Sequence, residues 1–282
     1  MYGRRQQQYG GQQQYGRRRG GGQFKFMLMI GLAMAAFQAF KYFTSAQVNP
    51  VTGESQRVTW TVDEEIALGL QSAPQMAQQH GGLHADQNAQ DLLDRVGEKL
   101  ARSDWAQKSG YPYDFHLLAD NQVVNAFALP GGQTFITAAL FGRLENEDQL
   151  AGVMGHEIGH VIHRHGAVRT AKANFIQGLI QSVMIGSGGD HSMAQIANTV
   201  GQYANMKYGR DQELESDEWG VRLMMDAGYD PYEMIGVMDI LEEASGGSGR
   251  VPEFQSSHPS PENRRGKIKE AIERYQKELD LR

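Results

Sequence analysis

The sequence predicts an α+β domain that is predominantly helical, contains a small antiparallel sheet and is preceded by one transmembrane helix. Three observations support this fold class. Most segments beyond residue 60 repeat apolar residues at helical spacing, three short apolar segments lie between residues 113 and 140, and one apolar run lies near the N-terminus. Of the 282 residues, about 220 remain after the N-terminal part, enough for one domain with a buried core.

Residues 1–23 consist mainly of Gln, Gly, Tyr and Arg. Because this segment has little to bury, we expect a disordered basic tail; contact of the tail with anionic lipid or RNA is the alternative. Residues 1–25 carry six basic side chains and no acid, so the formal net charge of −6 leaves −12 on the rest of the chain. An acidic body is a poor nucleic-acid binder, and we expect no nucleic-acid partner for it.

Residues 24–43 are predicted to be a transmembrane anchor. Phe26–Phe40 is apolar except for one glutamine, and at about 1.5 Å per residue it covers roughly 22 Å. Spanning a membrane therefore requires Lys41 to reach toward the interface, with the aromatic residues after it lengthening the run. The alternative is a cleaved signal peptide, because Thr44-Ser45-Ala46 offers small residues in a cleavage-like arrangement.

The charge on the two sides of the anchor predicts its orientation. Basic residues precede it and the acidic body follows, so we expect a single-pass membrane protein with a cytoplasmic N-terminus. The body would then face the periplasm or an equivalent extracytoplasmic compartment. Residues 44–60 are polar and are predicted to be a linker, which places the folded domain at residues 61–282.

Two helices are predicted at the start of the domain. Thr61 and the acidic residues 63–65 supply a cap and a favourable first turn for a helix that continues to about residue 79. The second helix, residues 88–103, is amphipathic, with an apolar face formed by Leu92, Leu93, Val96 and Leu100.

Three strands are predicted next, at residues 113–120, 122–130 and 132–140. They are short, apolar and partly alternating, and turn residues separate them at Asp120-Asn121 and Pro130-Gly131-Gly132. Together they predict the small antiparallel sheet.

The rest of the domain is predicted to be helical. After the cap residue Asn146, helical periodicity runs from Glu147 to His165 and ends at Gly166. Further helices are predicted around residues 175–184, 193–203, 211–228 and 231–245, and at the C-terminus. Residues 245–263 form a glycine-rich loop, and a loop of this length inside a compact domain is expected to be functional.

The helix at 147–165 carries the motif His156-Glu157-Ile158-Gly159-His160. Histidines at positions i and i+4 lie on the same helix face, close enough for both imidazoles to reach one zinc ion. Glu157 lies about 100° away around the helix axis, where its carboxylate can take a proton from zinc-bound water. The chain has no cysteine, so any metal must be held by histidine and carboxylate.

A catalytic zinc needs a third protein ligand. A third histidine six residues beyond the second is excluded, because Gly166 occupies that position. Glu213 and Asp217 are spaced i, i+4 on a separate helix, so the first can ligate zinc while the second accepts a hydrogen bond from a ligand histidine. Glu215 is the alternative third ligand.

These motifs resemble the gluzincin family of zinc metallopeptidases that includes the HtpX, CAAX prenyl, BepA and Oma-type proteases. The resemblance covers roughly residues 60–275. It rests on Asn125-Ala126-Phe127, Pro130-Gly131-Gly132, the His156–His160 motif with His165, the Arg210, Glu213 and Asp217 spacing, and the His258-Pro259 segment ending in Arg264.

The resemblance implies a zincin-like metalloprotease domain with one Zn²⁺ per chain. His156, His160 and Glu213 would be the zinc ligands, Glu157 the general base and Asp217 a hydrogen-bond partner behind the ligands. His258 would be an auxiliary residue that approaches the metal, the alternative being a loop histidine packed against its proline. His163 and His165 are expected to be packing or surface residues.

The resemblance also gives the strand around Phe127 a role. In zinc peptidases an edge strand above the active-site helix pairs with an extended substrate. Asn125 and Phe127 are therefore candidate substrate-strand residues, although Asn125 has the alternative of a turn-capping amide. The expected partners are protein or peptide substrates and the membrane.

The sequence thus predicts a membrane-anchored zinc endopeptidase that acts in envelope protein quality control. The alternative is a non-proteolytic, chaperone-like or scaffold protein that retains a zinc site.

Overall fold

The computed structural model describes residues 21–187, 208–246, 253–259 and 263–281. The predicted tail falls outside these ranges except for its last three residues, and so does the predicted helix at 193–203. The described part confirms the predicted fold class, which is largely helical with a small sheet and one apolar helix near the N-terminus.

Helix α1 (Gly21–Thr44) holds the predicted anchor. Its segment Phe24–Thr44 is long and apolar enough to cross a membrane, and only 6% of its most apolar window is buried. The predicted linker contains a two-stranded antiparallel sheet, β1 (Ala46–Val48) and β2 (Ser55–Arg57). The turn between these strands is fixed by Asn49, whose Oδ1 atom accepts hydrogen bonds from two backbone amides, and by Gly53 at φ +74°.

Three helices open the domain. Helix α2 (Val62–Gln79) begins with a capping box of Thr61 and Glu64, as the sequence predicts. Helix α3 (Gln87–Ala101) is capped by Asp86 and buries its apolar face, and the short helix α4 (Asp104–Lys108) follows it.

The sheet consists of β3 (Asp114–Leu118), β4 (Ala126–Ala128) and β5 (Gln133–Thr137), in the order β3-β5-β4. The β4–β5 pair is antiparallel as predicted, whereas β3 and β5 are parallel. The difference arises because β3 pairs with the far side of β5 instead of with β4, its neighbour in sequence. Every residue of β5 is buried, and β4 is left at one edge of the sheet.

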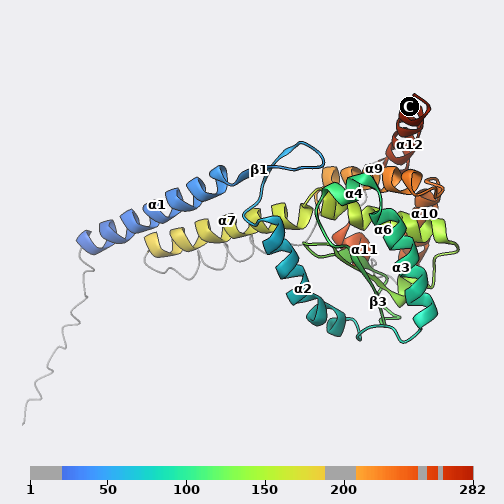
Figure 1. Ribbon diagram of the computed structural model, residues 1–282. Helices are drawn as coiled ribbons and strands as arrows, with labels where there is room; N and C mark the ends of the chain where they lie inside the picture. The colour runs from blue at the N-terminus through green and yellow to red at the C-terminus, as the bar shows by residue number, and fades with distance from the viewer. Residues whose placement is uncertain (1–20, 188–207, 247–252, 260–262, 282) are drawn as a thin grey trace, which may run out of the picture.

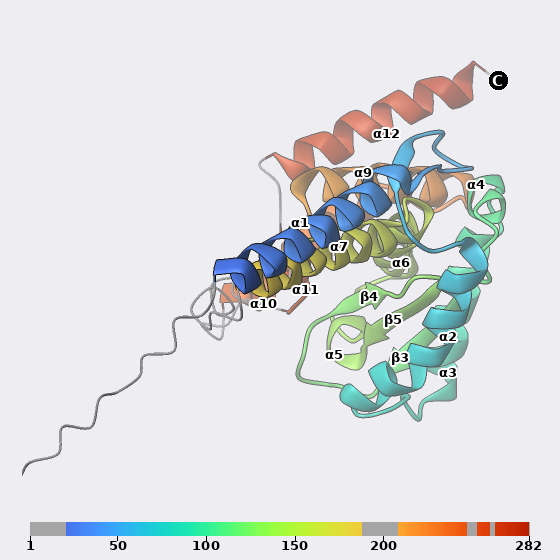
Figure 2. The same ribbon diagram turned by 90° about the vertical axis from the view of Figure 1, so that its left-hand side faces the viewer.

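After the short helix α5 (Ala138–Phe141), helix α6 (Glu147–Ile162) runs through the centre of the domain with 14 buried residues. The remaining helices are α7 (His165–Gly186), α9 (Arg210–Asp226), α10 (Glu233–Gly246), α11 (Glu253–Ser257) and α12 (Arg264–Asp280). Figure 2 shows α12, α9, α6 and the sheet stacked in this order. Helix α11 lies within the segment predicted to be one long loop.

Close approach of α6 and α9 depends on small residues. A Cβ atom at Gly159 would lie 2.8 Å from the backbone oxygen of Ser216, and one at Gly155 would lie 3.2 Å from the Cα atom of Gly220. The glycines therefore bring the helix with the histidine motif directly against the helix with Glu213.

The prediction of one helix from 147 to 165 is wrong at its end. Helix α6 stops at Ile162, and Arg164 adopts a left-handed conformation with φ 54° before α7 begins. Local sequence does not favour this break. It is held by tertiary contacts, because the guanidinium of Arg164 donates a 2.9 Å hydrogen bond from Nε to buried Glu65 on α2.

Helices α1 and α7 lie side by side and project together from the rest of the molecule (Figure 1). Their contact is close at Gly31, where a Cβ atom would meet the backbone of Ser182 and Gly186 at 2.5 and 2.9 Å. The rings of Tyr42 and Phe175 stack with centroids 4.4 Å apart. The helix that follows the histidine motif is thus packed along the apolar N-terminal helix.

Candidate metal centre

Helix α6 places the two motif histidines on one buried face. The Nε2 atoms of His156 and His160 lie 3.0 Å apart, and both residues are at most 3% exposed. Two imidazole nitrogens at this separation can share one ion, as the i, i+4 spacing predicts.

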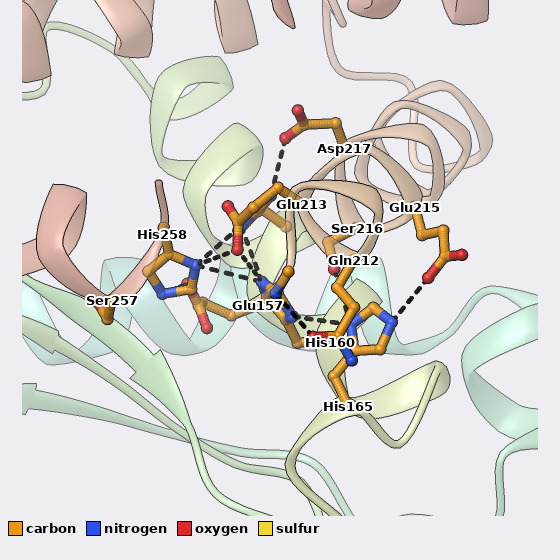
Figure 3. Close-up of polar contacts among 12 residues, drawn as sticks. Glu157, His160, His165, Gln212, Glu213, Glu215, Ser216, Asp217, Ser257 and His258 are labelled. Carbon is orange, nitrogen blue, oxygen red and sulfur yellow. Dashed lines mark hydrogen bonds and ion pairs between the residues drawn. The ribbon is translucent and has the colours of Figure 1, made fainter. Parts of the chain in front are cut away.

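Helix α9 brings Glu213 to the same point. Its carboxylate oxygens lie 3.5 Å from His156 Nε2 and 3.4 Å from His160 Nε2, and its side chain is fully buried. Glu215, the alternative third ligand, points to the other side of α9 (Figure 3). The structure therefore unites His156, His160 and Glu213, the three residues that the sequence selects.

His258, at the end of α11, joins this cluster. Its Nδ1 atom lies 3.1 Å from Glu213 Oε1, 3.3 Å from His156 Nε2 and 3.2 Å from His160 Nε2 (Figure 3). One nitrogen or oxygen from each of the four residues lies within 4.8 Å of the others. His258 is thus no surface loop residue; its ring is 1% exposed and stacks on Phe254 with centroids 4.4 Å apart.

The outer nitrogen of His156 contacts a carboxylate. His156 Nδ1 lies 2.8 Å from Asp217 Oδ1, and Arg264 Nε donates a 2.6 Å hydrogen bond to the other oxygen of Asp217. This series of hydrogen bonds orients the imidazole of His156 so that its Nε2 lone pair points toward the cluster. Asp217 thus occupies the place expected from its spacing to Glu213.

The outer nitrogen of His160 has a partner that the sequence did not predict. His160 Nδ1 lies 2.9 Å from His165 Nδ1, and His165 Nε2 lies 2.9 Å from Glu215 Oε2. His165 is 2% exposed, so it is neither a surface residue nor simple packing. The break at Arg164 turns the chain and sets this histidine behind His160, which helical spacing alone would not do.

The electrostatics of the cluster favour a bound cation. Burial acts to raise the pKa of Glu213, but hydrogen bonds from the three histidines outweigh it and hold this pKa far below its usual range. An ionised carboxylate therefore lies in the interior, and its Oε2 atom has no hydrogen-bond partner among the described residues; the guanidinium of Arg264 lies 3.5 Å from it. Such a buried charge is costly unless it is paired or coordinates a metal.

Glu157 lies beside the cluster of His156, His160, Glu213 and His258, and the pKa of its carboxyl group is shifted in the opposite direction from that of Glu213. Burial raises the pKa of the Glu157 carboxyl group above the usual value, although His258 and His156 oppose the shift. Neither of its oxygens has a side-chain hydrogen-bond partner among the described residues; the backbone of Ala128 on β4 acts to lower its pKa, and Oε1 lies 3.7 Å from His258 Nε2. A buried carboxyl group whose oxygens have no side-chain partner is suited to exchanging a proton with a bound reactant.

The two candidate substrate-strand residues lie at β4. Asn125 immediately precedes the strand and is 4% exposed; its Nδ2 atom donates a 3.3 Å hydrogen bond to Glu253, while its Oδ1 atom has no partner among the described residues. Phe127, in the strand, stacks on Phe135 of β5 with centroids 4.9 Å apart. Strand β4 also contacts α6, so an edge strand adjoins the histidine helix.

A mostly helical domain with two histidines one turn apart, a glutamate from a second helix and a buried carboxyl group beside them defines a metalloendopeptidase. The chain belongs to peptidase family M48, whose sequence profile matches residues 87–272. Membership of a metallopeptidase family implies a metal cofactor and protein or peptide substrates. This confirms the family resemblance predicted from the motifs.

The relatives to which the chain is similar are also named as proteases. The chain is 28% identical to the beta-barrel assembly-enhancing protease of Yersinia pestis, over 84% of this chain and 50% of the relative. It is 29% identical to the protein of the same name from Escherichia coli K12, over 78% of this chain and 46% of the relative. The mitochondrial metalloendopeptidase OMA1 of Schizosaccharomyces pombe is 24% identical, over 87% of this chain and 72% of the relative. The chain thus spans about half the length of the first two relatives.

Proposed function

We propose that the protein is a membrane-anchored, zinc-dependent endopeptidase in which His156, His160 and Glu213 hold the ion and Glu157 is the general base. The observation that carries this proposal is the convergence of two Nε2 atoms from α6 and one carboxylate from α9 within 4.8 Å of one another. The set of two histidines and one glutamate is typical of catalytic zinc, and the chain has no cysteine that could replace them.

Each residue of the site has a separate task. Zinc, when bound, polarises the scissile carbonyl and lowers the pKa of the attacking water. Glu157 takes a proton from that water and then delivers it to the departing amine. The raised pKa of the Glu157 carboxyl group supports this assignment, because a carboxylate that binds protons more readily is the better base. Asp217 and Arg264 keep His156 oriented throughout.

His258 controls access to the ion. Its Nδ1 atom lies among the ligand atoms, where it can supply a fourth donor, and a catalytic site must keep that position for water or substrate. We assign it the role of a reversible ligand that holds the site in a resting form and moves aside when substrate enters.

The edge strand β4 is the proposed substrate platform. An extended peptide can add to a free strand edge through backbone hydrogen bonds, which would align its scissile bond over α6. Phe127 would support this edge through its stacking on β5, and Asn125 would orient the start of the strand through its bond to α11.

The apolar helix α1 supports membrane attachment. We propose the division into a basic tail (1–23), an anchor (24–43), a linker (44–60) and a catalytic domain (61–282), with the N-terminus cytoplasmic and the domain extracytoplasmic. The charge difference across the anchor supports this orientation. The names of the relatives support a role in protein quality control of the envelope.

A second function is favoured by the position of His258. Four protein ligands around one zinc ion form a closed, structural site, and a protein with such a site could act as a chaperone or scaffold without cleaving its client.

Cleavage of unfolded and membrane-protein substrates by the purified full-length protein distinguishes the two functions. We expect the wild type to cut them, a chelator to stop it, and Glu157→Gln to bind zinc and substrate without cutting. A zinc-loaded wild type that binds these substrates and leaves them intact would establish the scaffold instead. Equal cleavage by Glu157→Gln would refute the general base.

A further inference from the structure

A second cluster of metal-ligating side chains lies behind the proposed catalytic centre. His163 and His165 flank Arg164 at the break between α6 and α7, and Glu215 faces them from α9. Glu215 Oε2 lies 2.9 Å from His165 Nε2 and 3.8 Å from His163 Nδ1. One ligand atom from each of the three residues lies within 4.8 Å of the others.

His163 is the unexplained member of this cluster. Its side chain is almost fully buried, yet neither ring nitrogen has a hydrogen-bond partner among the described residues. The ring stacks on His165 with centroids 5.0 Å apart and meets Trp219 edge-on at 5.8 Å. These contacts explain why the ring is buried here, but they give its two nitrogens no polar partner. A buried polar atom without a partner is destabilising, and a coordinated ion would provide a partner for one of the two nitrogens.

The charges around His163 favour a cation. Glu215 Oε2 lies 3.8 Å from His163 Nδ1, and the two side chains are close enough to reach one ion. A second carboxylate, Glu54 from the β1–β2 turn, lies 3.8 Å from His163 Nδ1. His163 Nδ1 is therefore equally distant from two carboxylates, Glu54 and Glu215.

The cluster is reachable from solvent. His163, Glu215 and Glu54 line an open pocket of about 350 Å³. Of its other charged residues, Arg222 pairs with Glu218 at 3.3 Å, and Glu218 also pairs with Arg274 at 2.8 Å. Among the described residues, Glu54 and Glu215 form ion pairs with histidines and with no lysine or arginine.

We propose that this pocket is a second metal site, in which His163, His165 and Glu215 bind a divalent transition metal and Glu54 completes the ligand set. Two imidazoles and two carboxylates match Zn²⁺ and its first-row neighbours and not the oxygen-only preference of Ca²⁺ or Mg²⁺. The second site adjoins the centre behind it, because the other nitrogen of His165 lies 2.9 Å from His160 Nδ1. With both Nε2 atoms on metal ions, the two facing Nδ1 atoms would share one proton, so binding of the second ion would release one proton to solvent. An ion in the pocket would hold the ring that supports His160.

Metal stoichiometry of the full-length, tag-free protein tests this proposal. The Glu157→Gln form avoids self-cleavage, and after chelation it is titrated with Co²⁺ or Zn²⁺, with bound metal measured by elemental analysis and by the Co²⁺ absorption spectrum. We expect two bound equivalents. His156→Ala should remove or weaken one of them, and Glu54→Gln should weaken the other by about tenfold or more.

Two further variants, His163→Asn and Glu273→Gln, complete the test. His163→Asn should abolish binding of the second equivalent. Glu54→Gln tests the same site without a change in the core, because the Glu54 side chain is 56% exposed. Glu273→Gln removes an exposed carboxylate on α12 and should keep both equivalents. A single bound equivalent in the parent form, or a second equivalent that neither Glu54→Gln nor His163→Asn weakens, would overturn the proposal. Because His156→Ala addresses the first site alone, failure of the catalytic assignment would be seen separately.

Discussion

The Nδ1 atom of His156 lies 2.8 Å from Oδ1 of Asp217, and this carboxylate is itself held by Arg264. The contact joins the histidine helix to the Glu213 helix behind the proposed ligands. It fixes which nitrogen of His156 carries the proton, and therefore which one is free to bind a metal.

Replacing Asp217 with Asn should weaken metal binding by about 10–100-fold, because an amide stabilises the proton on Nδ1 less well and leaves Arg264 only its longer contact of 3.5 Å with Glu213. Competition with a chromophoric chelator measures the affinity. Asp211→Asn, an exposed change on the same helix, is the matched control and should have no effect. An unchanged affinity in the Asp217 variant would show that the contact does not tune the site.

The Glu65–Arg164 pair should be essential for stability. Both side chains are buried, and Glu65 also accepts a 2.7 Å hydrogen bond from Tyr111. Glu65→Ala leaves the Arg164 charge buried and unpaired, so we expect a loss of about 3–5 kcal/mol in the free energy of unfolding. Denaturant unfolding measures it, with the exposed Asp63→Ala as a control that should cost no more than about 1 kcal/mol. Equal losses in the two variants would contradict the role of the pair.

His163 should make stability fall with acidity. Its pKa is about 4 in the folded protein against an ordinary 6.5, so between these values the unfolded chain binds a proton that the folded chain does not. Its contribution of about 3 kcal/mol is complete above pH 6.5 and is lost as the pH falls toward 4. Thermal unfolding of the wild type should therefore lose more stability between pH 7 and 4.5 than that of His163→Gln. Parallel pH profiles would be inconsistent with a neutral buried imidazole.

The packing of α1 on α7 can be tested by cross-linking, since the chain has no native cysteine. A Cβ atom at Gly186 would lie 3.8 Å from the Cα atom of Leu28, which is within the range of a disulfide. Cysteines at positions 28 and 186 should therefore cross-link in membranes under mild oxidation. Met29, which is 66% exposed, provides the control pair with position 186. Efficient cross-linking of the control alone would place the helices differently.

Local patterns predicted the elements of this fold better than their arrangement. The caps at Thr61 and Asn146 and the apolar periodicity locate most helices within a few residues. The parallel pairing of β3 with β5 was missed because strand partners are set by long-range packing. The break at Arg164 was missed for a related reason, since it depends on Glu65, which is 99 positions away in the sequence.

The residues of the candidate site also fall into two groups, those that local spacing predicts and those that only the tertiary structure brings into place. Spacing within a helix was enough to select His156, His160, Glu213 and Asp217, because residues four apart share a face. The placement of His258 against them could not come from spacing, as it lies in an irregular segment after α11. His165 was misjudged because its position behind His160 exists only after the chain turns at Arg164.

The most direct test of the account is the location of the bound ion in crystals of the Glu157→Gln protein, from anomalous diffraction at the zinc absorption edge. We predict a zinc peak about 2.0–2.2 Å from His156 Nε2, His160 Nε2 and a carboxylate oxygen of Glu213. A peak coordinated without Glu213, or a metal-loaded protein with no peak between these three side chains, would contradict it.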